Sequence, residues 1–130
     1  MDTSTKILSL AEAPAAARRL RDAGKTLKAV VGYFDPVLAG HARRLGALRE
    51  KTGALVAVVA DPPRPILPAR ARAELVAALA AVDYVVVLGD APLDGFLARL
   101  EADEVVRSEA ADQELTEGLI HHVRSRHSAI

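Results

Sequence analysis

Continuous apolar runs alternate along the chain with mixed polar and apolar segments, and this alternation predicts a series of strands and helices. The apolar runs predict strands over residues 27–31, 55–60, 84–88 and 104–106. The mixed segments predict helices over residues 13–23, 40–52, 69–81, 92–100 and 112–126. A strict succession of strand and helix is typical of α/β proteins.

Local signals mark the ends of these elements. Ser9 and Glu12 have the spacing of a capping box, which predicts the start of the first helix. Gly24 and Gly53 stand where the first two helices are expected to stop. Four prolines within residues 61–68 exclude a helix and a central strand there, so this segment is predicted to be a loop.

Strands that are apolar on both faces must be covered on both faces, which predicts a parallel sheet between two layers of helices. We therefore expect one domain over residues 1–130 with a three-layer α/β/α, Rossmann-like fold and about four to five parallel strands. In such sheets ligands bind beyond the carboxyl ends of the strands. The loops 32–40, 61–68 and 89–92 leave those ends, and we expect them to converge.

Composition narrows the range of partners. The 130 residues are 51% hydrophobic and only 3% aromatic, so the core must consist of Ala, Val, Leu and Ile. The 17 basic and 17 acidic residues cancel, which gives no global attraction to nucleic acid or to an anionic membrane. The chain has no cysteine, no apolar run long enough to span a bilayer and no signal-peptide pattern. We expect a cytoplasmic protein that binds neither nucleic acid nor membrane.

The segment 31–45 carries the clearest candidate chemistry. The strand ends at Gly32, the pair Phe34 and Asp35 follows, and Gly40 with His41 opens the next helix. A glycine at the end of a strand and free N–H groups at the start of a helix allow a phosphate to approach the backbone. This arrangement predicts a nucleotide or another phosphorylated ligand.

The same segment resembles the signature of the HxGH nucleotidyltransferases, the cytidylyltransferase-like superfamily. The resemblance extends over most of residues 6–107. Within the superfamily, the chain is most similar to the heptose-phosphate nucleotidyltransferase domain. Its four pieces, in order, are Lys6–Leu10 with Ala23-Gly24-Lys25, Gly32-x-Phe34-Asp35-x-x-x-x-Gly40-His41, Arg64-Pro65-x-x-Pro68-x-x-x-Arg72-Ala73-Glu74, and Val82–Val86.

The resemblance implies specific roles. His41 and Arg72 would stabilise the charge that develops on the phosphates during transfer, and N–H groups near Phe34 and Asp35 would hold the α-phosphate. The activity implied is transfer of a nucleoside monophosphate from ATP or CTP, with Mg²⁺, to a small phosphorylated sugar or polyol, with release of pyrophosphate. The nucleotide-binding residues implied are Gly32, Tyr33, Phe34, Asp35, Gly40, His41, Arg64, Arg72, Arg107 and Thr116.

The chain also departs from the family pattern. Leu38 replaces the first histidine of the motif, Arg107 has an altered context, and only Thr116 remains of a Ser/Thr-rich turn. Removing one preorganised donor typically costs roughly 3 kcal/mol of transition-state stabilisation. Two hypotheses therefore stay open: an active nucleotidyltransferase, or a catalytically degenerate nucleotide-binding or scaffold module of the same fold. In either case we expect a homodimer.

Each candidate residue also has a purely structural interpretation. His41 could be a helix N-terminal residue without a ligand, and Asp35 could cap a turn. Arg64 and Arg72 could be surface arginines.

Other polar residues are predicted to carry no chemistry. Arg43 and Arg44 are interpreted as a solvated helix face. His121 and His122 are adjacent, so they point about 100° apart on a helix and do not share a metal ion simply, even with His127 nearby. No metal site is predicted.

Overall fold

The computed structural model describes residues 2–128 and contains one five-stranded parallel sheet with the strand order β1-β4-β3-β2-β5. The strands are β1 (Ile7–Leu8), β2 (Leu27–Gly32), β3 (Ala54–Val59), β4 (Tyr84–Val87) and β5 (Glu104–Arg107). The helices are the short 3₁₀ turn η1 (Ser4–Lys6) and α1 (Glu12–Asp22), α2 (Ala39–Glu50), α3 (Ala69–Ala77), α4 (Leu93–Leu100) and α5 (Glu109–Ser128).

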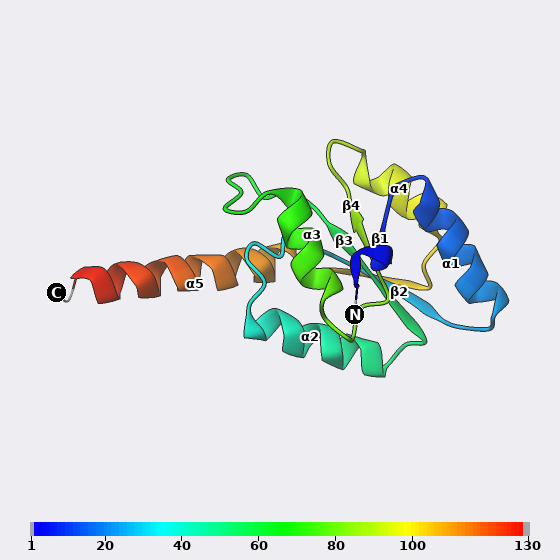
Figure 1. The fold of residues 1–130 in the computed structure, drawn as a ribbon, viewed down its shortest axis with the longest axis horizontal. Coiled ribbons are helices and arrows are strands. Elements are labelled where there is room, and N and C mark those ends of the chain that lie inside the picture. Colours follow the sequence, from blue (N-terminus) through cyan, green and yellow to red (C-terminus); the bar gives the residue numbers. More distant parts are fainter. Residues whose placement is uncertain (1, 129–130) are drawn as a thin grey trace.

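Helices cover both faces of the sheet, which confirms the predicted three-layer fold (Figure 1). On one face, α1 and α4 pack through a cluster that includes Ala13, Ala17 and Phe96. On the other face, α2 and α3 pack through a cluster that includes Leu45 and Val76. Every residue of β2 and β3 is buried, because these central strands are covered from both sides.

The predicted element boundaries agree with the structure to within a few residues. Ser9 and Glu12 form the predicted capping box: the Glu12 N–H donates to Ser9 Oγ at 3.0 Å, and the Ser9 N–H donates to Glu12 Oε1 at 2.9 Å. Gly24 follows α1 with a φ of +81°, which glycine adopts without strain. The helix predicted over residues 69–81 ends earlier, at Ala77, because turn hydrogen bonds lead the chain from there into β4.

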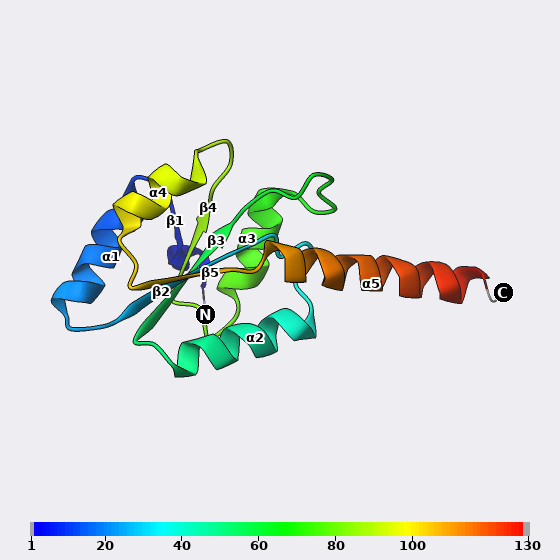
Figure 2. The same ribbon diagram turned by 180° about the vertical axis from the view of Figure 1, so that it is seen from behind.

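Helix α5 differs most from its prediction. It begins at Glu109 rather than near residue 112 and extends away from the sheet (Figures 1 and 2). Its first turn is fixed to the sheet by Ser108, whose hydroxyl donates to the Val31 carbonyl at 2.9 Å. Within the described residues, no helix is both long enough and apolar enough to cross a membrane.

Candidate functional site

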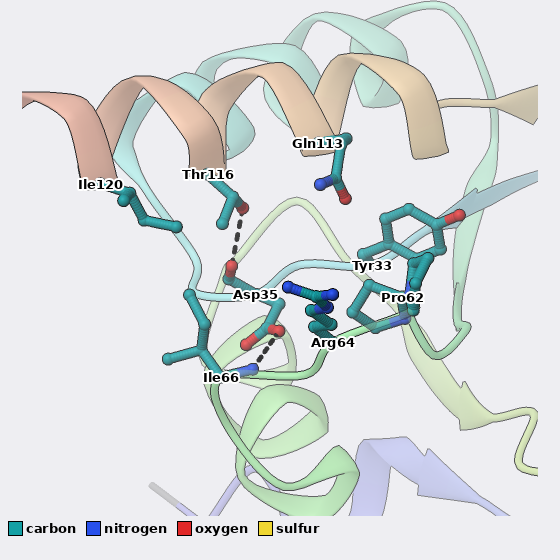
Figure 3. Close-up of a pocket in the computed structure, with 9 residues that line it drawn as sticks. Tyr33, Asp35, Pro62, Arg64, Ile66, Gln113, Thr116 and Ile120 are labelled. Atoms are coloured by element: carbon teal, nitrogen blue, oxygen red, sulfur yellow. Dashed lines mark hydrogen bonds between the residues drawn. The ribbon is translucent and has the colours of Figure 1, made fainter.

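A pocket of about 310 Å³ lies beyond the carboxyl ends of β2 and β3, beneath α5 (Figure 3). From β2 the chain continues to β3 and β4 on one side, and it later returns to add β5 on the other side of β2. The pocket lies at this reversal of strand order, which is the usual ligand position in such sheets. The lining residues come from the loop after β2, the proline-rich loop after β3 and one face of α5; they are Tyr33, Asp35, Pro62, Pro63, Arg64, Ile66, Gln113, Thr116 and Ile120.

Asp35 joins the two loops that form the pocket. Its carboxylate is almost fully buried and accepts hydrogen bonds from the backbone N–H groups of Ile66 at 2.6 Å and Leu67 at 2.8 Å. Its carbonyl oxygen accepts a hydrogen bond from Thr116 Oγ1 at 2.7 Å, which fixes α5 above the loops. Asp35 therefore stabilises the shape of the pocket, as the turn-capping interpretation proposed.

Arg64 is the basic residue that lines this pocket. It is exposed at the pocket, and its side chain lies below Gln113 and beside Asp35 (Figure 3). Within residues 2–128, no hydrogen bond or ion pair holds its guanidinium group. An arginine in this setting suits an anionic group such as a phosphate.

The Arg72 side chain, in contrast, is buried and bonded to other groups of the protein. The side chain is 1% exposed, and its guanidinium donates to the carbonyl oxygens of Leu67, Tyr33 and Ala60 at 3.0, 3.0 and 2.8 Å. It also forms an ion pair with Asp61. Arg72 therefore joins the two loops and is not among the residues that line the pocket; its predicted place beside a nucleotide stays a prediction. Its burial also contradicts the surface-arginine interpretation.

His41 is likewise turned into the interior. The ring is fully buried, and Nδ1 accepts a hydrogen bond from the Leu38 N–H at 2.9 Å, which completes the first turn of α2. The ring also packs against Phe34, with centroids 5.7 Å apart. We predicted an imidazole at the lip of a phosphate cradle, whereas the structure places it behind the loop, away from the pocket lining. Leu38 does not line the pocket either.

The Asp112 carboxylate binds N–H groups of the loop that was predicted to hold an α-phosphate. This fully buried carboxylate accepts hydrogen bonds from the backbone N–H groups of Tyr33 at 2.7 Å and Phe34 at 3.4 Å. The other carboxylate oxygen lies 3.0 Å from Arg44 Nη1 and 3.1 Å from His41 Nε2. The interpretation of Arg44 as a solvated side chain is therefore wrong.

The remaining predicted residues lie outside the pocket lining. A Cβ added at Gly32 would lie 2.3 Å from Asp112 Oδ2, and one added at Gly40 would lie 3.3 Å from Leu115. Because neither glycine has a side chain, α5 can pack closely against both positions. Arg107 is exposed and pairs with Glu109, whose hydrogen bonds raise the pKa of its guanidinium. The loop 89–92 contributes nothing to the lining, because β3 separates β4 from β2.

The structure thus brings together Tyr33, Asp35, Arg64 and Thr116 of the predicted residues. Sequence reasoning missed Gln113 and Ile120, although their spacing from Thr116 places all three on one face of a helix. No local signal distinguished Asp112 among the acidic residues of α5. Among the described residues, no group of three or more His, Asp or Glu side chains is arranged to hold a metal ion.

Comparison with known proteins gives consistent results. The family model described as "Cytidylyltransferase-like" matches residues 29–129. A "Bifunctional protein HldE" from Magnetococcus marinus is 38% identical over 103 residues, which cover 72% of this chain and 21% of that protein. The protein of the same name from Syntrophotalea carbinolica is 38% identical over 84 residues, which cover 57% and 17%. The chain therefore spans about a fifth of the length of these relatives.

A solved structure supports the fold. The lipopolysaccharide core biosynthesis protein from Thermoplasma volcanium superimposes with a TM-score of 0.59 at 22% identity, over 63% of this chain and 73% of that one. At this identity the likeness concerns the architecture alone. It agrees with the parallel sheet and the flanking helices described above.

Proposed function

The chain belongs to the cytidylyltransferase-like family, and on that premise we propose that it is a nucleotide-binding module of the nucleotidyltransferase fold that does not transfer nucleotides efficiently. This proposal rests on one observation: both side chains that were predicted to be catalytic are bonded to other groups of the same chain. His41 is bound by the Leu38 N–H, and Arg72 by three carbonyl oxygens and Asp61.

The pocket offers complementary surfaces for a nucleotide. Tyr33, Pro62 and Ile66 provide apolar surface in the pocket, on which a flat base can pack. Arg64 provides an unpaired cation for a phosphate, and Gln113 provides an amide that can both donate and accept hydrogen bonds. These groups support binding without supplying a group that acts on the reacting phosphorus.

Catalysis of nucleotidyl transfer depends on donors that are already aimed at the developing charge. In this chain the side chains of His41 and Arg72 would have to leave their buried partners before they could reach a triphosphate. Release of Arg72 leaves three carbonyl oxygens without their donor, and release of His41 leaves the Leu38 N–H without its acceptor. Each such loss costs about 1–3 kcal/mol. The geometry therefore favours binding over turnover.

Nucleotidyl transfer is the second candidate function. The similarity to the HldE proteins favours it, as does the position of Arg64 and Thr116 beside the pocket. In this hypothesis the chain would transfer a nucleoside monophosphate from ATP or CTP to a small phosphorylated sugar or polyol and release pyrophosphate. Mg²⁺ bound to the triphosphate would be part of the substrate.

Calorimetry and a turnover assay test both candidates. We expect ATP or CTP to bind, and Arg64→Ala to weaken binding about tenfold or more, the loss typical of a charge-assisted contact. Arg70→Ala is the matched control, because Arg70 is exposed on α3 and pairs with Glu74 away from the pocket. Pyrophosphate release in the presence of Mg²⁺ and a panel of sugar phosphates would establish the transferase instead. Absence of nucleotide binding would refute both.

We also propose that two copies associate through α5. This helix projects from the body of the protein (Figure 2). Ile120 and Val123 on it are 36% and 57% exposed. Its first half is acidic and its second half is rich in histidine and arginine, so antiparallel pairing would bring opposite charges together. Sedimentation should give a dimer, and Val123→Asp should give a monomer; a monomeric wild type would contradict this.

A further inference from the structure

The carboxylate of Asp112 has the environment of a bound anion. It is fully buried, yet it lies on a helix that otherwise projects from the domain. Two backbone N–H groups, of Tyr33 and Phe34, donate to one of its oxygens, and Arg44 donates to the other. We call these three donors, together with the neighbouring Nε2 of His41, the anion cradle.

The backbone of the first loop is shaped for this anion. Phe34 has a φ of +50°, and in this left-handed conformation successive N–H groups turn toward the same point. Gly32 keeps the approach open, because a Cβ there would lie only 2.3 Å from the carboxylate oxygen. Tyr33 takes part in the cradle through its backbone and also lines the pocket, so the two sites adjoin.

The cradle contains one more donor than the carboxylate satisfies. Nδ1 of His41 accepts a hydrogen bond from a backbone N–H, so the hydrogen of the neutral ring lies on Nε2. This buried Nε2 lies 3.1 Å from an oxygen of the Asp112 carboxylate, yet it makes no hydrogen bond within the described residues. A tetrahedral oxyanion has more acceptor atoms than a carboxylate, and these could meet such a donor.

We propose that Asp112 is a resident anion that determines the specificity of the pocket by filling the position of a ligand phosphate. In the described conformation the pocket accepts a nucleoside or a nucleotide whose phosphates lie toward Arg64, and a phosphate enters the cradle only when Asp112 leaves it. This inference rests on the proposed function, in which the adjoining pocket binds a nucleotide. The side chain of Asp112 alone would then exclude phosphate from the cradle.

Removal of the resident anion tests the inference. Asp112→Ala should leave the donors of the cradle unpaired, so inorganic pyrophosphate should bind this variant at least about tenfold more tightly than the wild type in calorimetry. Added phosphate or pyrophosphate should also raise the melting temperature of the variant, because a ligand that binds only the folded state stabilises it. The wild type should show no comparable rise.

Asp103→Ala is the matched control. The Asp103 carboxylate also accepts a hydrogen bond from a strand N–H, that of Leu27 at 2.6 Å, but it is exposed and belongs to no cradle. This variant should lose stability without recovery by anions. If Asp112→Ala does not fold, Asp112→Asn, which keeps the shape and one acceptor oxygen, should still bind pyrophosphate more tightly than the wild type.

The inference is overturned if neither variant at position 112 binds pyrophosphate more tightly than the wild type, or if anions stabilise the Asp103 and Asp112 variants equally. Its failure is distinct from that of the proposed function. Pyrophosphate has no base, and Arg64 is common to the variant and the wild type, so the difference in their pyrophosphate affinities reports only the cradle. Binding of adenosine or cytidine to the wild type tests only the pocket.

Discussion

Replacement of Arg72 by methionine distinguishes a structural arginine from one that contacts a ligand. The guanidinium is 1% exposed and donates to three backbone carbonyl groups from two different loops. Methionine retains an unbranched apolar stem but has no donor, so Arg72→Met removes the hydrogen bonds and the ion pair with Asp61. The loops after β2 and β3 would then lose their common anchor.

The magnitude follows from the groups left without a partner. Each buried acceptor that loses its donor costs about 1–3 kcal/mol, and breaking a buried charged network costs about 3–5 kcal/mol in total. Asp61 is exposed and regains hydration, which favours the lower part of this range. We expect Arg72→Met to lower the free energy of unfolding by about 3–4 kcal/mol, a large share of the 5–15 kcal/mol typical of a domain.

Urea unfolding followed by circular dichroism measures this loss directly. Arg70→Met is the matched control on the same helix, because Arg70 is 62% exposed and its pair with Glu74 contributes at most about 0.5 kcal/mol. Arg72→Lys keeps the positive charge without the planar fork and should lie between the two.

The reasoning is refuted if Arg72→Met loses less than about 1 kcal/mol of stability while nucleotide binding is abolished. That combination would mean that the guanidinium serves the ligand and not the loops. A large stability loss, with nucleotide affinity retained below the melting temperature, would support the structural role.

Two further predictions concern the loops around the pocket. Asp35→Ala removes the acceptor for two N–H groups of the proline-rich loop, so it should cost about 2–3 kcal/mol and make residues 62–66 sensitive to limited proteolysis; an unchanged digestion pattern would contradict this role. Gly32→Ala places a Cβ 2.3 Å from Asp112 Oδ2 and should destabilise the protein by about 1–3 kcal/mol. Thermal unfolding should show a smaller effect of Gly32→Ala in an Asp112→Ala background, with some destabilisation remaining from the Phe34 ring, which lies 2.9 Å from the same added Cβ. Fully additive losses would exclude direct contact with Asp112.

The local signals of the sequence were sufficient for most of the architecture. Continuous apolar runs identified β2, β3 and β4, and the pairing of Ser9 with Glu12 identified the start of α1, because both patterns depend on neighbouring residues. The strand β1 was missed because two residues, Ile7 and Leu8, give no periodicity. The loops at the carboxyl ends of β2 and β3 were expected to meet, and they do.

The local pattern of the chain was enough to predict a parallel α/β/α fold and the edge of the sheet at which the pocket lies. Which polar groups face that pocket depends on contacts between distant segments of the chain. Tyr33 and Asp112 are 79 residues apart in the sequence, and Tyr33 and Arg72 are 39 apart, so no local pattern reports these contacts. The physical reason is that a buried charge must find partners wherever the fold supplies them. In this chain His41, Arg72 and Asp112 are buried against such partners, whereas Arg64 lies at the pocket.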